Sequence, residues 1–101
     1  MSVVNLSKTA AGLPEAWSSL ELGRVGTACV KVLRMDEMPV AEESHSAAEA
    51  LIVLDGLLEL VVDGAPVSVR AGEMFMVAAG TAHTVRPGSH GTLVIVELPD
   101  E

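Results

Sequence analysis

Aromatic residues are nearly missing from this chain of 101 residues. Trp17 and Phe75 are the only two, and there is no tyrosine, so a core has to be built from aliphatic side chains and methionine. Proteins that bind single-stranded nucleic acid stack its bases on aromatic rings. Basic residues are also few, with six Lys and Arg against fourteen Asp and Glu and a formal net charge of −8. Such a charge repels phosphate backbones, so we expect no nucleic-acid partner.

Cysteine and long hydrophobic runs are scarce as well. The single cysteine, Cys29, has no partner within the chain for a disulfide, so nothing calls for an oxidising compartment. Residues 1–16 lack the basic start and the sustained apolar run of a signal peptide. The most apolar stretch, 51–62, is interrupted by Asp55 and Glu59 and is shorter than the about 20 residues that span a bilayer. We expect a soluble, cytoplasmic protein with no membrane partner.

The remaining composition favours one β domain. Half of the residues are apolar, which at this length allows one domain with one core. From Val25 onward, short aliphatic runs alternate with turn signals, a pattern typical of an all-β sandwich or barrel. Asp55-Gly56 and Asp63-Gly64 stand between apolar runs, and each predicts a hairpin turn. The expected strands are Thr27–Met35, Ala50–Leu54, Leu57–Val62, Val67–Arg70, Glu73–Val77, His83–Val85 and Thr92–Leu98.

The first quarter of the chain is interpreted as a short N-terminal arm, residues 1–24, before a single barrel domain at 25–101. The only plausible helical turn in it lies around residues 14–18, where Pro14 suits the start of a helix. Trp17 is expected to pack this arm onto the barrel or onto a second subunit, because a lone aromatic side chain usually serves burial.

Two of the three histidines lie at the margins of predicted strands. Imidazole is the commonest side-chain ligand of metals. Glu43 stands two positions before His45, on the same face of a strand, and Glu49 stands four positions after it. His83 follows a glycine turn that can direct its ring inward. Spacing alone leaves two interpretations open, a convergent metal site or a solvated loop with a surface ion pair.

These segments resemble the two sequence motifs of the cupin superfamily, and the resemblance covers about residues 43–98. The first motif has a His-any-His pair, a Glu, six residues and a Gly, and its counterparts here are Glu43-Ser44-His45, Glu49 and Gly56. The second motif runs Gly, five residues, Pro-any-Gly, two residues and His, and its counterparts are Gly72, Ala78-Ala79-Gly80 and His83. The chain departs from the pattern twice, with Glu43 in place of the first His and Ala78 in place of the Pro.

The resemblance implies a small single-domain bacterial cupin, with the double-stranded β-helix fold, a jelly-roll-like barrel, and a site inside its cavity. It implies that His45, Glu49 and His83 are ligands of one divalent metal ion, such as Mn, Fe, Zn or Ni. If Glu43 also coordinates the ion, the ligand set is harder and favours Mn, Fe or Zn. If Glu43 does not, the other three form a two-His-one-carboxylate set, which suits non-haem Fe(II).

A third possibility is a cavity without metal. Glu43 and Glu49 would then share a low-dielectric site, where one carboxyl group with a raised pKa becomes a general acid or base. Glu43 is the candidate for that role if it is not a ligand.

Leu51 and Val53 share the face of Glu49 in the alternation of a strand and are the expected apolar lining of the cavity. The resemblance implies a metal-dependent oxygenase, isomerase or lyase such as a decarboxylase that acts on a small organic molecule. The alternative is a non-catalytic module that binds or senses a small ligand, and likeness of fold does not choose between them. Small cupins resemble one another in pairing through sheet edges or arms, so we also expect a homodimer.

Three further expectations concern single side chains. Met74 and Met76 alternate with Phe75 in a predicted strand and are expected to fill the core or to line the cavity. His90 lies in a glycine-rich segment and is expected to be exposed. Cys29 is expected to behave as a small buried hydrophobic residue.

Overall fold

The computed structural model describes residues 2–38 and 40–99. In this part of the chain the elements are α1 (Leu6–Ala11), β1 (Leu20–Val25), β2 (Ala28–Met35), β3 (Val40–Glu43), β4 (Glu49–Val62), β5 (Ala65–Arg70), β6 (Met74–Val77), β7 (His83–Val85) and β8 (His90–Glu97). Neighbouring strands pair antiparallel throughout the sheet. The predicted all-β class is therefore confirmed.

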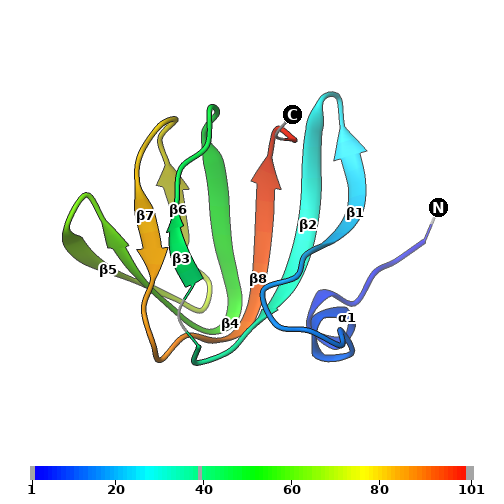
Figure 1. Cartoon of the computed structure of the whole chain (residues 1–101). Coiled ribbons are helices and arrows are strands. Elements are labelled where there is room, and N and C mark those ends of the chain that lie inside the picture. The colour runs from blue at the N-terminus through cyan, green and yellow to red at the C-terminus, as the bar shows by residue number, and fades with distance from the viewer. Residues whose placement is uncertain (1, 39, 100–101) are drawn as a thin grey trace.

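All eight strands of the described residues belong to one curled sheet. Its order is β1-β2-β8-β4-β7-β3, and β5 and β6 also pair with β4. Figure 1 shows the sheet curled, with β1 and β3, the two ends of this order, on opposite sides of its concave face, which is called the hollow below. The helix α1 lies outside the curl, where it contacts β2 and β8. This arrangement leaves the inner face of the sheet available for a site.

The strand β4 runs without interruption through Asp55-Gly56, so the hairpin predicted at this dipeptide is wrong. A register shift between Val53 and Asp55 marks a β-bulge in the pairing with β8. Gly56, which follows the shift, has a positive φ of 82°, a backbone conformation that glycine adopts without strain. A Cβ atom at Gly56 would lie 2.0 Å from the carbonyl oxygen of His90. The dipeptide therefore bends a continuous strand and lets β8 approach it closely.

The bulge reverses the side-chain alternation of β4. Before it, the buried side chains are those of Glu49, Leu51 and Val53; after it, they are those of Leu58 and Leu60. Successive side chains of a regular strand point to opposite faces. The extra residue at the bulge therefore moves the inward-facing positions from odd-numbered to even-numbered residues. Both halves of β4 can thus direct apolar side chains into the same hollow.

The second predicted hairpin, at Asp63-Gly64, is confirmed. Val62 and Ala65 are paired at the ends of β4 and β5, which leaves Asp63 and Gly64 as a two-residue turn. Their φ angles are 48° and 79°, and two successive positive φ angles define the turn that suits the twist of a hairpin.

The N-terminal segment differs from its prediction at two places. The helix forms at Leu6–Ala11, capped by the side chain of Asn5, whereas residues 14–18 form no helix. Residues 20–25 form the edge strand β1, which was not predicted, and five of its six side chains are exposed. Trp17 packs against the core and donates a hydrogen bond from Nε1 to Asp36 Oδ1 at 3.1 Å, as expected of a residue that holds this segment on the domain.

Two apolar clusters lie on the two faces of the sheet. The inner cluster contains Leu33, Met35, Leu51, Val53, Leu58, Leu60, Val69, Val77 and Leu93. On the outer face, Ala10 of α1 packs against Val32 and Val94. Cys29 is buried as expected, and His90 is exposed, although it begins a strand.

Met74 and Met76 point outward and are exposed, whereas Phe75 packs against the inner cluster. The prediction that the two methionines fill the core or line the cavity is wrong. Strand β6 pairs with β4 in a register that turns Phe75 inward with its partner Leu51.

Candidate metal centre

Four of the residues singled out in the sequence meet at one end of the hollow. Glu43 is the last residue of β3, Glu49 the first of β4, and His83 the first of β7. The pairing of β3 with β7 sets Glu43 opposite His83. His45 lies between β3 and β4, and its carbonyl oxygen accepts a hydrogen bond from the Gly80 amide at 2.7 Å. The glycine turn before His83 therefore also holds the loop that carries His45.

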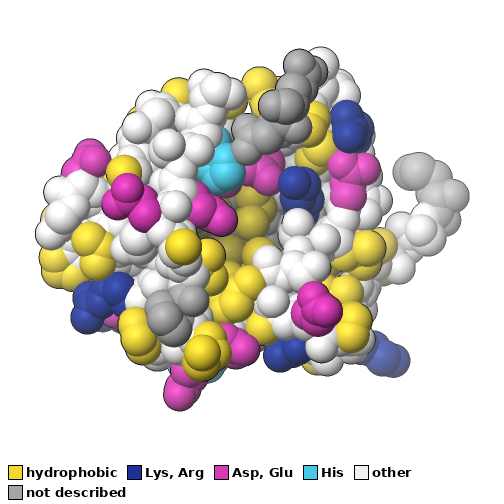
Figure 2. Space-filling view, in the orientation of Figure 1, with side chains coloured by type: hydrophobic (Ala, Val, Ile, Leu, Met, Phe, Trp, Pro, Cys, Tyr) yellow, Lys and Arg dark blue, Asp and Glu magenta, His cyan; other side chains and the backbone are white. Residues whose placement is uncertain are grey.

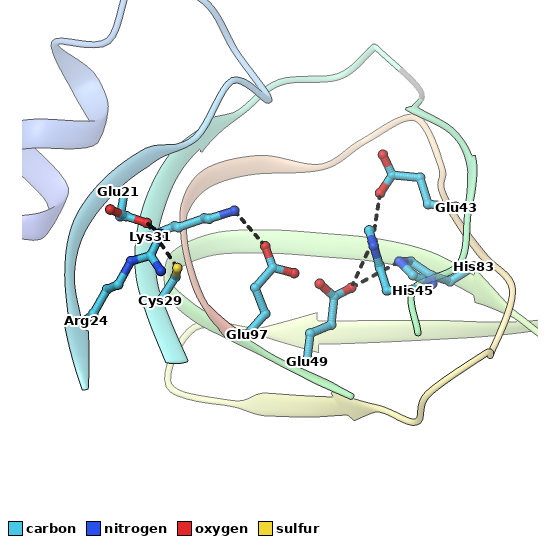
Figure 3. A network of polar contacts seen from close by, with 9 residues as sticks. All are labelled: Glu21, Arg24, Cys29, Lys31, Glu43, His45, Glu49, His83 and Glu97. Atoms are coloured by element: carbon cyan, nitrogen blue, oxygen red, sulfur yellow. Dashed lines mark hydrogen bonds and ion pairs between the residues drawn. The ribbon is translucent and has the colours of Figure 1, made fainter. Parts of the chain in front are cut away.

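The side chains of these residues are close together (Figure 3). His83 Nε2 lies 3.2 Å from Glu49 Oε1, and His45 Nε2 lies 4.0 Å from the same oxygen. His45 Nε2 is 3.7 Å from Glu43 Oε2. The carbonyl oxygen of Thr81 lies 3.1 Å from His83 Nδ1, and because a carbonyl can only accept, Nδ1 carries the hydrogen in that bond. The other ring nitrogen, Nε2, faces Glu49 and is the atom available to a metal ion.

Burial differs strongly within the group. The side chains of Glu49 and His83 are each 6% exposed, whereas that of Glu43 is 52% exposed. His45 is intermediate. The site therefore has a buried side at β4 and an open side at β3.

A fifth residue, Glu97, was not predicted as part of the site. It ends β8 directly opposite Glu49 in the pairing of the two strands, and the two carboxyl groups share a hydrogen bond. Lys31 Nζ donates to Glu97 Oε1 at 2.9 Å. One signal in the sequence pointed to Glu97: it is an acid at the end of an aliphatic strand, two residues from Ile95, on the face that the alternation turns inward.

Burial raises the pKa of Glu49 to about 7, and the hydrogen bond with Glu97 and the charge of Glu97 act in the same direction. Burial alone would also raise the pKa of Glu97, but the hydrogen bonds from Glu49 and Lys31 lower it. Glu49 is thus the member of the pair that holds a proton, which it donates to the ionised Glu97. A raised pKa was expected for Glu43 or Glu49 as a pair, and the carboxyl group that faces Glu49 is that of Glu97.

Two groups of side chains can each place ligand atoms within 4.8 Å of one another. One contains Glu43, His45 and His83; the other contains His45, Glu49 and Glu97. Imidazole nitrogens and carboxylate oxygens are a ligand set for divalent Zn, Mn, Fe and Ni ions. Carboxyl groups held together in a buried site also need a proton or a cation between them. The residues present therefore fit a divalent metal ion.

The hollow beside these residues is a cavity of about 210 Å³, enough for about seven water molecules. Its walls are mostly aliphatic, formed by Leu33, Leu51, Leu58, Leu60, Leu93 and Ile95. Figure 2 shows a hydrophobic floor with histidine, acidic and basic side chains around the opening. Leu51 lines the cavity, whereas Val53 lies deeper, with no exposed surface, in the inner cluster. Val53 lies next to the bulge and pairs with Leu93 of β8.

The sequence profile of the cupin domain family matches residues 34–99. The match covers more than half of the chain and includes both motifs, so the chain belongs to the cupin family. No curated protein sequence matches it. Within the described residues, no helix is long and apolar enough to cross a membrane.

Solved structures agree with this fold. A cupin-2 domain protein of Shewanella frigidimarina superposes with a TM-score of 0.86 at 19% identity, over 96% of this chain and 95% of that one. An RmlC-like cupin of the same organism gives a TM-score of 0.71 at 19% identity, over 82% and 76% of the two chains. The EutQ protein of Clostridium difficile gives 0.72 at 18% identity, over 95% and 81%. At these identities the likeness concerns the fold.

Proposed function

We propose that this cupin binds one divalent metal ion, Mn, Fe, Zn or Ni, through His45, Glu49 and His83, together with a small organic molecule in the hollow. The observation that carries the proposal is the convergence of imidazole and carboxylate groups at the end of an aliphatic cavity. The loop before β4 and the first residue of β4 supply His45 and Glu49, and the distant strand β7 supplies His83. Ligand pockets of proteins typically combine apolar walls with a few convergent polar groups.

The cavity suits a ligand with an oxygen-bearing end and an aliphatic part. A bound divalent ion would polarise an oxygen atom of that ligand. Leu51, Leu58 and Leu60 would pack against the aliphatic part and exclude water from it. Glu43, half-exposed at the opening of the cavity, is the candidate acid–base group. A metal-dependent oxygenase, isomerase or lyase is the enzyme class in accord with this arrangement.

The alternative function is a metal-free module that binds or senses a small ligand. One observation favours it: among the described residues, no buried side-chain nitrogen or oxygen lacks a hydrogen-bond partner. The proton shared by Glu49 and Glu97 thus satisfies the buried carboxyl groups without an ion. The cavity is the same in both functions, and metal content distinguishes them.

Metal content is measured by mass spectrometry on protein purified without chelator or nickel resin. The wild type and a His45→Ala/His83→Ala double variant are compared, with His90→Ala as the matched control, because His90 is an exposed histidine of another segment. We expect about one ion per chain in the wild type and the control, and much less in the double variant. A wild type with no more metal than the double variant would remove the metal-dependent function and leave the sensing module.

We also propose a cytoplasmic homodimer. The edge strand β1 exposes Val25 and Leu20, and an exposed apolar edge strand is a site for pairing with another chain. The buried single cysteine accords with a reducing compartment. Light scattering is expected to give the mass of two chains for the wild type and of one chain for Val25→Lys. A wild type at the mass of one chain would refute the dimer.

A further inference from the structure

We propose that the fourth protein ligand of the ion is Glu97 and not Glu43, the residue that stands at the position of the missing motif histidine. The inference rests on the proposed metal binding and specifies the ligand set. It makes the site a two-His-two-carboxylate centre whose carboxylates come from the paired strands β4 and β8.

The first argument is the position of Glu97 beside Glu49. The two residues are paired across β4 and β8, so their side chains leave the sheet on the same face, next to each other. A ligand atom of each lies within 4.8 Å of the other and of a ring nitrogen of His45. Figure 3 shows the Glu97 carboxylate between Lys31 and Glu49. An ion bound by His45 and Glu49 therefore has Glu97 within reach.

The second argument is that Glu97 is already held in place. Lys31 Nζ binds one of its oxygens, Oε1, at 2.9 Å, and this leaves Oε2 for a second partner. Its side chain is 14% exposed, so little conformational freedom is lost when it binds an ion. Carboxylate ligands of metals are commonly oriented by such an outer hydrogen bond. Lys31 supplies it from the neighbouring strand β2.

Glu43 lacks both features. Its ligand oxygen also comes close to His45 and His83, so distance alone does not decide between the two acids. Glu43, however, belongs to the edge strand β3, where the pairing with β7 is irregular, and its side chain is 52% exposed. Fixing an exposed glutamate on an ion costs side-chain entropy, and water competes for its oxygens. Glu97, the less exposed of the two acids, is therefore the better ligand.

The test compares Glu97→Gln with Glu43→Gln, two nearly isosteric changes that each remove one anionic oxygen ligand. Binding of Mn²⁺ and Zn²⁺ to metal-free protein is measured by titration calorimetry, and the visible spectrum of the Co²⁺ form reports the ligand set. We expect Glu97→Gln to weaken binding about tenfold or more and to change the Co²⁺ spectrum. We expect Glu43→Gln to weaken it by less than about fivefold, the range of an exposed charge, with an unchanged spectrum.

Several results separate the possible failures. If the wild type binds no ion, the proposed function fails with this inference. If the wild type binds an ion and the double histidine variant does not, but Glu97→Gln binds as tightly as the wild type, only the inference is overturned. A larger loss in Glu43→Gln than in Glu97→Gln also overturns it. Should Glu97→Gln fail to fold, Glu97→Asp keeps the charge beside Lys31 but withdraws the oxygens by one methylene. Unchanged affinity and spectrum in that variant would contradict the inference.

Discussion

The two faces of strand β4 carry equally apolar side chains, but only the inner face is buried along its length. Leu58 on the inner face is 1% exposed, whereas Leu54, near the bulge, is 38% exposed. On the outer face, α1 covers Val32 and Val94 of the neighbouring strands. Beyond the helix the apolar side chains of Met74 and Met76 stay open to solvent. Hydrophobicity along a strand therefore does not by itself say which face forms the core.

The largest effect on this difference between the two faces is expected from a substitution next to the bulge in β4, because the bulge lets both halves of the strand turn apolar side chains inward. We expect Gly56→Ala to lower the free energy of unfolding by about 3 kcal/mol or more, because its Cβ would lie 2.0 Å from the His90 oxygen. Gly72→Ala is the matched control, with a φ of 83° but no atom within 4 Å of its Cβ, and it should cost about 1 kcal/mol. Urea unfolding measures both. Equal decreases in the free energy of unfolding for Gly56→Ala and Gly72→Ala would show that the close approach of β8 to Gly56 does not affect stability.

Removing apolar volume from the two faces should have unequal effects. Leu58→Ala is expected to lower the free energy of unfolding by about 3 kcal/mol, because it leaves a cavity in the inner cluster. Leu54→Ala removes the same atoms from a partly exposed side chain and should cost less than about 1 kcal/mol. Chemical denaturation of the two variants makes the comparison, and it fails if their midpoints and slopes coincide.

The carboxyl groups at the polar end of the inner face should make the free energy of unfolding depend on pH. The pKa of Glu49 is about 7 in the folded protein against an ordinary value of 4.5, so between these values only the folded state holds this proton. The contribution of this proton to the free energy of unfolding is therefore fully present below pH 4.5, and it is lost as the pH rises through 7. The lowered pKa of Glu97 acts below this window.

For metal-free wild type we expect a decrease on the order of 2 kcal/mol in the free energy of unfolding across that window. Glu49→Gln carries no titrating group at this position and should show a flatter profile. Urea unfolding at a series of pH values, with a chelator present, measures the difference. Parallel profiles for the two proteins would count against the raised pKa.

The smallest effect is expected on the uncovered outer face. Met74→Ser and Met76→Ser change exposed side chains and should alter the free energy of unfolding by less than about 0.5 kcal/mol. Thermal unfolding of both variants at the same protein concentration is the measurement. A loss above 1 kcal/mol in either variant would mean that this face is covered in solution.

The two Asp-Gly dipeptides show how far local sequence could be used. Both allow positive φ, and both were predicted as hairpins. Asp63-Gly64 forms one, whereas Asp55-Gly56 lies inside a continuous strand, directly after a bulge. The two dipeptides differ in the strand that pairs with the residues around them. Strand β8 binds continuously along β4 on both sides of Asp55, and Asp55 Oδ1 accepts a hydrogen bond from the Thr92 amide. A pairing partner from the end of the chain cannot be read from the dipeptide.

The candidate site was predictable where its residues belong to motifs. The resemblance of their segments to the two cupin motifs implied that Glu43, His45, Glu49 and His83 are neighbours, and the structure brings them together. Glu97 belongs to no motif, and only the register between β4 and β8 sets it against Glu49. The division into a buried and an open side also depended on which strand became an edge.

By itself the sequence determined the β class, the cupin motifs, the acidic charge and the turn at Asp63-Gly64, because these follow from composition, spacing and local backbone preferences. The tertiary structure alone decided which face of β4 is buried, where the chain bends, and that Glu97 and Lys31 join the site. These properties depend on pairing between residues distant along the chain, and the free energy of such pairing comes from burial and registered hydrogen bonds across the sheet.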